Sequence, residues 1–394
     1  MRLEATTTVR APHSRTSIAR DVCRRILACG LYHSPMLRAF ERIAGSHVLR
    51  RDAGFSMPRL QPSAGSKFGI LCYHRVGTKG APLFSRLDPS VFEAQMRYVK
   101  KHYRVVPLGQ LCEELHDERK VEPTLAITFD DGYRDLYTHA FPVLRKYEIP
   151  ATIYLIGRCM KTGEVPWYDR IFAALKAAPG AALEVDMDGS CRLELSSPEA
   201  RLQGAWRIVS FLRTINDSRR RAWCAAFEDR IEVSQEELEG RMLDWGQVRT
   251  MHSGGVSFGA HTMSHPSVSH LSDDAFDEEF VQTKHLLEYG LGAPVLDFAY
   301  PFGKPSDWST TAENFVARCG YRSAVTTSEG YNTFGTSPYR LRRLQIDDDR
   351  SVASFAFSLG RLFLEGSFDF PVASSESPEC EGLPQTAESN RIGS

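Results

Sequence analysis

The chain has 394 residues, of which 42% are hydrophobic and 25% charged, and its formal net charge at pH 7 is -1. These values are typical of an ordinary globular protein with one or two domains. They exclude a protein that binds nucleic acid through a strong excess of basic residues. No run of 18 or more apolar residues indicates a membrane span.

The nine cysteines are scattered along the chain, and no two of them form a C-x-x-C pair. This distribution argues against a disulfide framework and against a thiolate zinc site. The sequence also begins without the pattern of a secretory signal peptide. Together these features predict a cytoplasmic protein.

The two ends of the chain differ in composition from its middle. Between Met1 and Asp52 there are ten arginines, no lysines and four acidic residues, and apolar residues recur there at helical spacing. We expect residues 1–64 to form a basic, partly helical arm, which either packs on the main domain or makes a peripheral contact with the inner membrane face. An organellar transit segment has a similar composition. Residues 366–394 are polar and rich in Ser, Glu and Pro, so we expect a disordered tail.

Apolar runs alternate with helical periodicities between residues 65 and 365, which we assign to one main domain. Strands are predicted at 67–77, 124–132, 150–157, 255–262, 294–303, 321–330 and 339–346. Helices are predicted at 90–102, 137–149, 309–320, where Thr310 and Glu313 form a capping box, and from Ser272 to Gly290. Strand–helix alternation with about seven strands predicts parallel pairing, either in an open doubly wound sheet or in a barrel.

Polar residues at the ends of at least four predicted strands favour the barrel. These residues are His74, the pair Asp130–Asp131, His261 and the segment Tyr300–Phe302. A barrel gathers the carboxyl ends of all its strands around one mouth, whereas an open sheet brings ligands mainly to its switch point. The sequence therefore predicts an α/β fold whose site lies at the mouth of a barrel.

The stretch from about residue 157 to 244 interrupts the strand–helix alternation. It holds a helical pattern at 165–180, a β-like piece at 182–195 and a charged helical region at 200–230. We interpret it as a mostly helical insertion within the barrel. It either roofs the mouth and shapes a substrate groove or is a peripheral elaboration.

Two histidines in "GAHTMSH", His261 and His265, are four residues apart directly after a predicted strand. Such a pair can share a metal ion, although a lone H-x-x-x-H is more often a pair of surface histidines. Catalytic zinc usually has three protein ligands and one open position. A third ligand is available from Asp130 or Asp131, because "TFDDG" ends another strand.

The adjacent carboxylates of Asp130 and Asp131 need an explanation, because side by side they repel each other. Alone, "DDG" is typical of a solvated turn. With the histidines present, one carboxylate can bind the cation while the other takes a proton from water. Gly132 permits a turn at this point, which lets both carboxylates face the mouth.

In this order, "TFDDG", "HTMSH" and "FAYPFG" resemble the motifs of the NodB-homology polysaccharide deacetylases, carbohydrate esterase family 4. The resemblance spans roughly residues 67–346. It implies a distorted (β/α)7 barrel and metal-dependent removal of N-acetyl groups from amino sugars. It also implies that Asp130 is the general base, that Asp131, His261 and His265 hold the metal, and that the backbone N–H of Phe302 helps to bind the oxyanion.

The sequence departs from the family's motifs at two places. Ala299 stands where the family usually has an arginine that orients the base, and the usual late histidine acid is absent. Arg343, or else Arg340 or Arg342, can take the place of the missing arginine by pairing with Asp130 and orienting it. A subgroup that resembles exopolysaccharide-modifying deacetylases uses an early histidine as the acid, which implies this function for His74 in "LCYHRV".

Two histidines and one carboxylate suit Zn2+ first, and also Co2+, Mn2+ or Fe2+. The expected substrate is an N-acetylated glycan, or a lipid- or nucleotide-linked precursor if the protein acts in the cytoplasm. Two other functions fit the same residues. One is a non-catalytic glycan-binding protein, and the other is an O-acetyl esterase or a hydrolase of another amide.

Overall fold

The structure of the protein is a computed structural model. It describes residues 67–364, except for 78–85, 118–122, 232, 234–237, 239–240 and 347–350. The predicted basic arm at 1–64 and the predicted tail at 366–394 lie outside the described residues. Within the described part, no helix combines the length and the apolar character that crossing a membrane requires.

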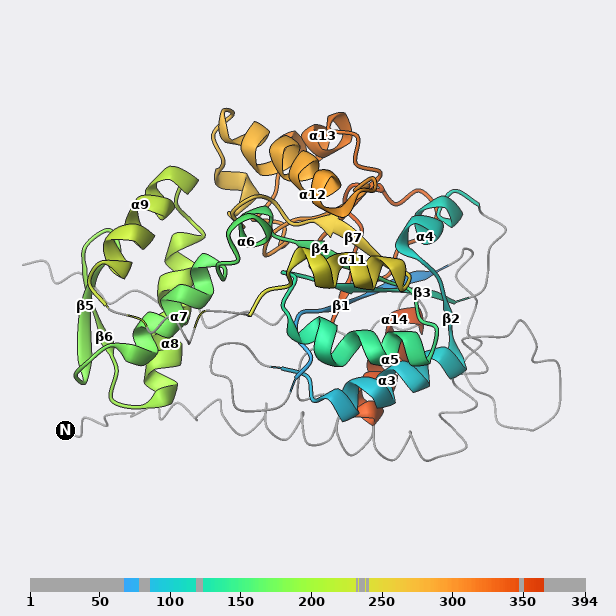
Figure 1. Cartoon of the computed structure of the whole chain (residues 1–394), viewed down its shortest axis with the longest axis horizontal. Helices are drawn as coiled ribbons and strands as arrows, with labels where there is room; N and C mark the ends of the chain where they lie inside the picture. The colour runs from blue at the N-terminus through green and yellow to red at the C-terminus, as the bar shows by residue number, and fades with distance from the viewer. Residues whose placement is uncertain are drawn as a thin grey trace, which may run out of the picture.

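A curled parallel sheet forms the centre of the fold (Figure 1). Its strands run in the order β10-β1-β3-β4-β7-β8-β9, and β2 pairs with β3 beside this path. Their bounds are β1 Phe68–Tyr73, β2 Arg104–Val105, β3 Thr124–Phe129, β4 Ala151–Leu155, β7 Val256–Ala260, β8 Asp297–Ala299, β9 Ser323–Val325 and β10 Leu344–Gln345. All pairs in this sheet are parallel, as predicted.

One short segment brings the two edges of the sheet together. Leu341 bridges Val325 of β9 in parallel, and three residues later Leu344 pairs with Leu71 of β1. The distorted (β/α)7 barrel that the sequence predicted is therefore confirmed, and the distortion lies in its short last strands.

The central strands are buried along their whole length, because helices cover the outside of the sheet. Every residue of β1, β3 and β4 is buried, which matches their nearly continuous apolar sequences. The covering helices are α3 Pro89–His102, α4 Leu108–Glu114, α5 Phe141–Lys146, α6 Gly157–Thr162, α11 Trp245–Ser253, α12 Thr283–Leu291, α13 Thr310–Arg318 and α14 Val352–Leu364. Short non-α turns lie at η1 Leu136–Ala140, η2 Val268–His270 and η3 Asp277–Gln282.

Several predicted boundaries are wrong. The strand predicted at 321–330 is only β9, because the chain leaves the extended conformation on the way to Gly330 and Gly335, which have φ of 147° and 82°. The helix predicted from Ser272 to Gly290 is divided into η3 and α12 and ends at Gly292 with φ 74°.

The predicted capping box of α13 is also wrong. The residue that caps α13 is Ser309, whose backbone is extended and whose Oγ accepts from the Ala312 N–H. The carboxylate of Glu313 instead accepts from Ser337 and Arg340.

Residues between α6 and α11 form the insertion at one end of the molecule, beside the sheet (Figure 1). Its described elements are α7 Trp167–Ala177, the antiparallel hairpin β5 Ala182–Asp186 and β6 Ser190–Glu194, α8 Pro198–Leu212 and α9 Asp217–Glu228. These elements bury an apolar core of their own. One residue of the barrel, Phe302, packs against that core, so the insertion touches the mouth region.

Candidate active site

The site begins where β3 ends. Asp130 continues the pairing with β1, since its N–H donates to the Tyr73 carbonyl at 2.9 Å. Asp131 and Gly132 then adopt left-handed backbone with φ of 72° and 79°. A Cβ at position 132 would lie 2.6 Å from Leu155 Cδ2, and the positive φ strains any other residue, so glycine is favoured there. This turn leaves both carboxylates buried at the end of the barrel.

Arg343 is the arginine that pairs with Asp130. Its Nη1 and Nη2 lie 2.7 Å from Oδ1 and Oδ2 of Asp130, and its Nε donates to the Thr326 carbonyl at 2.7 Å. Both side chains are almost completely buried. Burial alone would raise the pKa of Asp130, but the charge and hydrogen bonds of Arg343 outweigh this and hold the pKa well below its usual range. The Asp130 carboxylate is therefore ionised and fixed in orientation.

Asp131, His261 and His265 converge at the same place. The Nε2 atoms of both histidines lie 3.6 Å from Asp131 Oδ1, and all three possible ligand atoms lie within 4.8 Å of one another. The Nδ1 of His261 lies 2.7 Å from the Ala299 carbonyl, so it carries the proton and leaves Nε2 available. One carboxylate oxygen and two imidazole nitrogens thus face a common point.

The electrostatics of this group fit a divalent cation. Burial, followed by the nearby charge of Asp130, raises the pKa of Asp131 to about 8. Burial lowers the pKa of His261 to about 4, and the pKa of His265 is lowered as well. Both imidazoles are therefore neutral, and a nearby positive charge would stabilise the ionised form of Asp131. Two neutral imidazoles and one carboxylate are the donor set that Zn2+ and similar ions bind.

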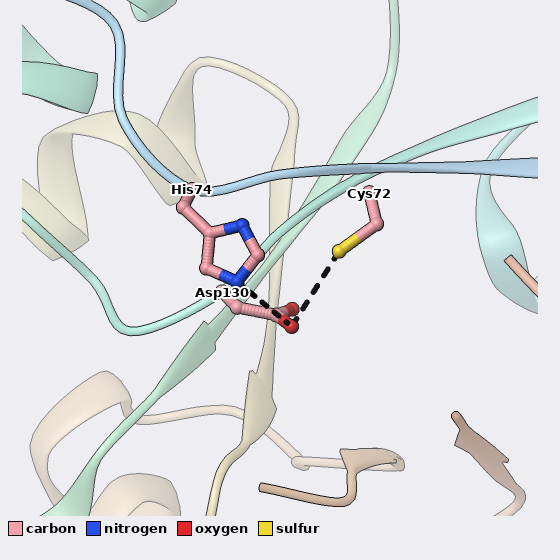
Figure 2. Close-up of side chains that lie close together, drawn as sticks. All are labelled: Cys72, His74 and Asp130. Carbon is pink, nitrogen blue, oxygen red and sulfur yellow. Dashed lines mark hydrogen bonds and ion pairs between the residues drawn. The ribbon is translucent and has the colours of Figure 1, made fainter. Parts of the chain in front are cut away.

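A second group of possible ligands consists of Cys72, His74 and Asp130 (Figure 2). Figure 2 shows His74 and Cys72 pointing toward Asp130, whose Oδ2 lies 3.9 Å from His74 Nε2 and 3.6 Å from Cys72 Sγ. Both oxygens of Asp130 are already bound by the cation of Arg343, which would repel a metal ion. Burial also raises the pKa of the Cys72 thiol well above normal, which keeps it protonated. We therefore favour Asp131, His261 and His265 as the metal ligands, and regard Cys72 as a donor to Asp130.

Comparison with known proteins agrees with this geometry. The family model described as "Polysaccharide deacetylase" matches residues 117–324, more than half of the chain. The chain belongs to the polysaccharide deacetylase family.

Three similar proteins share 20–30% of their residues with this chain over the matched regions. YxkH of Bacillus subtilis is 20% identical over 292 residues, which cover 74% of this chain and 75% of YxkH. The poly-beta-1,6-N-acetyl-D-glucosamine N-deacetylase of Escherichia coli K12 is 30% identical over 105 residues, or 26% of this chain and 16% of that protein. The solved Streptococcus pyogenes deacetylase PplD, in complex with acetate, matches with a TM-score of 0.52 and 20% identity, over 75% of this chain and 99% of PplD. That likeness supports the fold.

The "FAYPFG" segment continues from β8 toward the site. The backbone of Phe302 is left-handed, with φ 59°, and its carbonyl accepts from Thr327 Oγ1 at 2.6 Å. The Phe302 ring lies edge-on to the His265 ring, with centroids 4.8 Å apart. The segment therefore brings the side chain of Phe302 next to His265, one of the three possible metal ligands.

Sequence reasoning did not single out several residues that support the site. Glu279 of η3 is completely buried and accepts from the N–H groups of Met263 and Ser264, between the two histidines. Trp167 and Arg213 of the insertion contact His265 and Phe302, respectively. No local pattern marks such residues, because each is recognisable only from what it touches after folding.

Proposed function

We propose that this protein is a divalent-metal-dependent N-deacetylase that releases acetate from an N-acetylated amino sugar of a glycan. The observation that carries the proposal is that two adjacent carboxylates at the end of β3 have different partners. Asp130 is ionised and clamped by Arg343, whereas Asp131 is free of that clamp and faces His261 and His265. A base and a metal ligand are thus separated although they are adjacent in sequence.

Each residue then has one function in the proposed reaction. When bound, a divalent cation polarises the acetyl carbonyl and lowers the pKa of the attacking water. Asp130 takes the proton of that water, and Arg343 keeps Asp130 ionised and oriented. The N–H of Phe302 donates to the oxyanion that forms on the carbonyl.

His74 completes the reaction in this proposal. Its side chain is 41% exposed and its Nε2 lies 3.9 Å from Asp130 Oδ2, so it can face both the base and a substrate at the mouth. As the C–N bond breaks, His74 donates a proton to the leaving nitrogen. The products are acetate and a free amine on the sugar.

The substrate is proposed as a class. The "FAYPFG" motif favours the exopolysaccharide-modifying subgroup, and the Escherichia coli and Staphylococcus epidermidis relatives bear the name poly-beta-1,6-N-acetyl-D-glucosamine N-deacetylase. The Staphylococcus epidermidis protein matches over 20% of this chain. We therefore put β-1,6-linked N-acetylglucosamine oligomers first, ahead of lipid- and nucleotide-linked N-acetylhexosamines. The membrane contact predicted for residues 1–64 stays a prediction, because it concerns residues outside the described part.

The test is acetate release from these three kinds of substrate and from an O-acetylated sugar, with Zn2+ and with a chelator. We expect release from at least one N-acetylated substrate, loss of release with the chelator, and recovery after Zn2+ is added back. Release from the O-acetylated sugar alone would identify an esterase. Glycan binding without any release would identify a binding protein and reject the proposal.

A further inference from the structure

Trp167, the first residue of α7 in the insertion, contacts the turn that carries a proposed metal ligand. Its indole Nε1 donates to the His265 carbonyl at 3.0 Å, and its side chain is buried. The neighbouring Tyr168 presents its ring edge-on to the His265 ring at 4.9 Å. His265 has a left-handed backbone with φ 57°, a conformation that is unfavourable for a residue other than glycine. The hydrogen bond from Trp167 opposes relaxation of this strained turn.

Arg213, directly after α8 in the insertion, holds the other side of the site. Its Nη2 lies 2.9 Å from both carboxylate oxygens of Asp307, and its guanidinium lies 4.3 Å from the centre of the Phe302 ring. Asp307 is itself buried and accepts from the Lys304 N–H at 3.0 Å. Arg213 therefore fastens the segment from Phe302 to Asp307 to the insertion at two points.

These two contacts involve two of the left-handed non-glycine residues at the site, where Asp131 and Thr262 are left-handed as well. Like His265, Phe302 is left-handed without being glycine. The insertion that supplies Trp167 and Arg213 has its own buried core, so it is a firm support for them. The rings of Trp167 and Phe302 also meet, with centroids 6.3 Å apart.

We propose that the insertion is a working part of the deacetylase centre, in which Trp167 positions the metal ligand His265 and Arg213 positions Phe302. Neither residue touches the reacting atoms in this proposal, which rests on the proposed function. Trp167 has its polar contact with the turn at His265, whereas Arg213 has its own with Asp307 in the segment after Phe302, so their effects should separate. Loss of the Trp167 hydrogen bond should weaken metal binding, whereas loss of Arg213 should impair turnover and acetate binding but not metal binding.

The first experiment measures Zn2+ affinity of the full chain by competition with a chromophoric chelator. Trp167→Phe keeps an aromatic ring and removes only the N–H donor. We expect its Zn2+ affinity to fall about tenfold, since losing a partner that orients a metal ligand typically costs 10- to 100-fold. Trp206→Phe is the matched control: Trp206 lies in α8 of the same insertion, 45% exposed, and should bind Zn2+ within about twofold of the parent.

The second experiment measures kcat from acetate release. It also measures the affinity for acetate from the absorption spectrum of the Co2+-loaded protein. Arg213→Gln should lower kcat about tenfold and weaken acetate binding, with Zn2+ affinity within about twofold of the parent. Arg219→Gln is its matched control, because Arg219 also pairs with an aspartate, Asp188, and lies over a phenylalanine ring, Phe211, but on the outside of the insertion. Arg213→Lys should recover part of the loss, since lysine keeps the charge near Asp307.

Circular dichroism at the assay temperature checks that each variant is folded, and Arg213→Lys replaces Arg213→Gln if the latter is not. Unchanged Zn2+ affinity in Trp167→Phe, or unchanged kcat and acetate affinity in Arg213→Gln, would overturn the proposal. Equal losses in the two control variants would overturn it as well. If the parent protein releases no acetate from any glycan, the proposed function fails, yet the Zn2+ and acetate affinities still decide whether the insertion positions the two residues.

Discussion

Arg343 and Asp130 are 213 residues apart in sequence and form a buried, two-point ion pair at the mouth of the barrel. Arg343 lies between Leu341, which bridges β9, and Leu344, which pairs with β1. The segment that closes the barrel is therefore the one that supplies the partner of the proposed base. Closure of the fold and ionisation of Asp130 depend on the same short stretch of chain.

Replacing Arg343 by methionine should destabilise the protein and impair turnover. Removing one partner of a buried ion pair leaves the other charge uncompensated, which costs about 3–5 kcal/mol. The free energy of unfolding in urea measures this cost, and kcat measures the loss of an oriented base. Arg340→Gln is the control, because Arg340 is 53% exposed in its pair with Glu313 and should contribute about 0–1 kcal/mol. A cost for Arg343→Met no larger than that of Arg340→Gln would contradict the prediction.

Asp130→Asn and Asp131→Ala should have different effects although the residues are neighbours. The amide introduced by Asp130→Asn cannot take the proton of the attacking water, so kcat should fall by about 10²- to 10⁴-fold while Zn2+ still binds. The change Asp131→Ala removes the only carboxylate of the ligand group, so Zn2+ binding and turnover should both be lost. Zn2+ titration and acetate release are measured on each variant. Full activity of Asp130→Asn would show that Asp130 is not the base.

Glu279→Gln should loosen the turn that carries both histidines. Glu279 Oε2 accepts from the Met263 and Ser264 N–H groups at 2.8 and 2.9 Å, and its Oε1 accepts from Ser264 Oγ at 2.6 Å. The NH2 of glutamine cannot accept any of these bonds, and a buried donor without a partner costs about 1–3 kcal/mol. We expect that loss in the free energy of unfolding, together with weaker Zn2+ binding.

The neighbouring Glu278 offers a matched control for Glu279. Its side chain is 37% exposed, and within the described part of the chain its carboxylate forms an ion pair with Arg221 alone. Glu278→Gln should therefore change the free energy of unfolding by less than about 1 kcal/mol. If both variants lose the same stability, the turn between the histidines does not depend on Glu279 in the way described.

Gly303→Ala should cost more than the same change at another left-handed glycine. A Cβ at Gly303, where φ is 68°, would lie 2.7 Å from the Thr327 backbone nitrogen. At Gly335, φ is 82° and no atom lies within 4 Å of such a Cβ. Gly335→Ala should thus show only the backbone cost, about 1–2 kcal/mol, and Gly303→Ala a further cost of about 1–3 kcal/mol from steric strain. Thermal or urea unfolding compares the two, and equal costs would mean that the loop after Phe302 adapts freely.

Local sequence patterns were enough to predict the fold and the segments that form the site. The apolar runs of β1, β3 and β4 are buried on both faces, so their sequences alone mark them as strands of a parallel sheet. The polar residues that follow these runs predicted one common site at the end of the barrel, because the carboxyl ends of parallel strands lie on the same side. The predicted ends of helices were less accurate where a single capping side chain sets the first residue. Ser309, for example, caps α13 in place of the predicted Thr310.

Only the tertiary structure decided which distant residues meet. The sequence offered Arg340, Arg342 and Arg343 as partners of Asp130 but could not choose among them, because the register of the last strand comes from its pairing with β1 and β9. Trp167 and Arg213 carry no motif, and their contacts with His265 and Phe302 arise from the packing of the insertion on the barrel. A sequence records its local periodicity directly, whereas contacts between remote segments exist only after the chain has closed on itself.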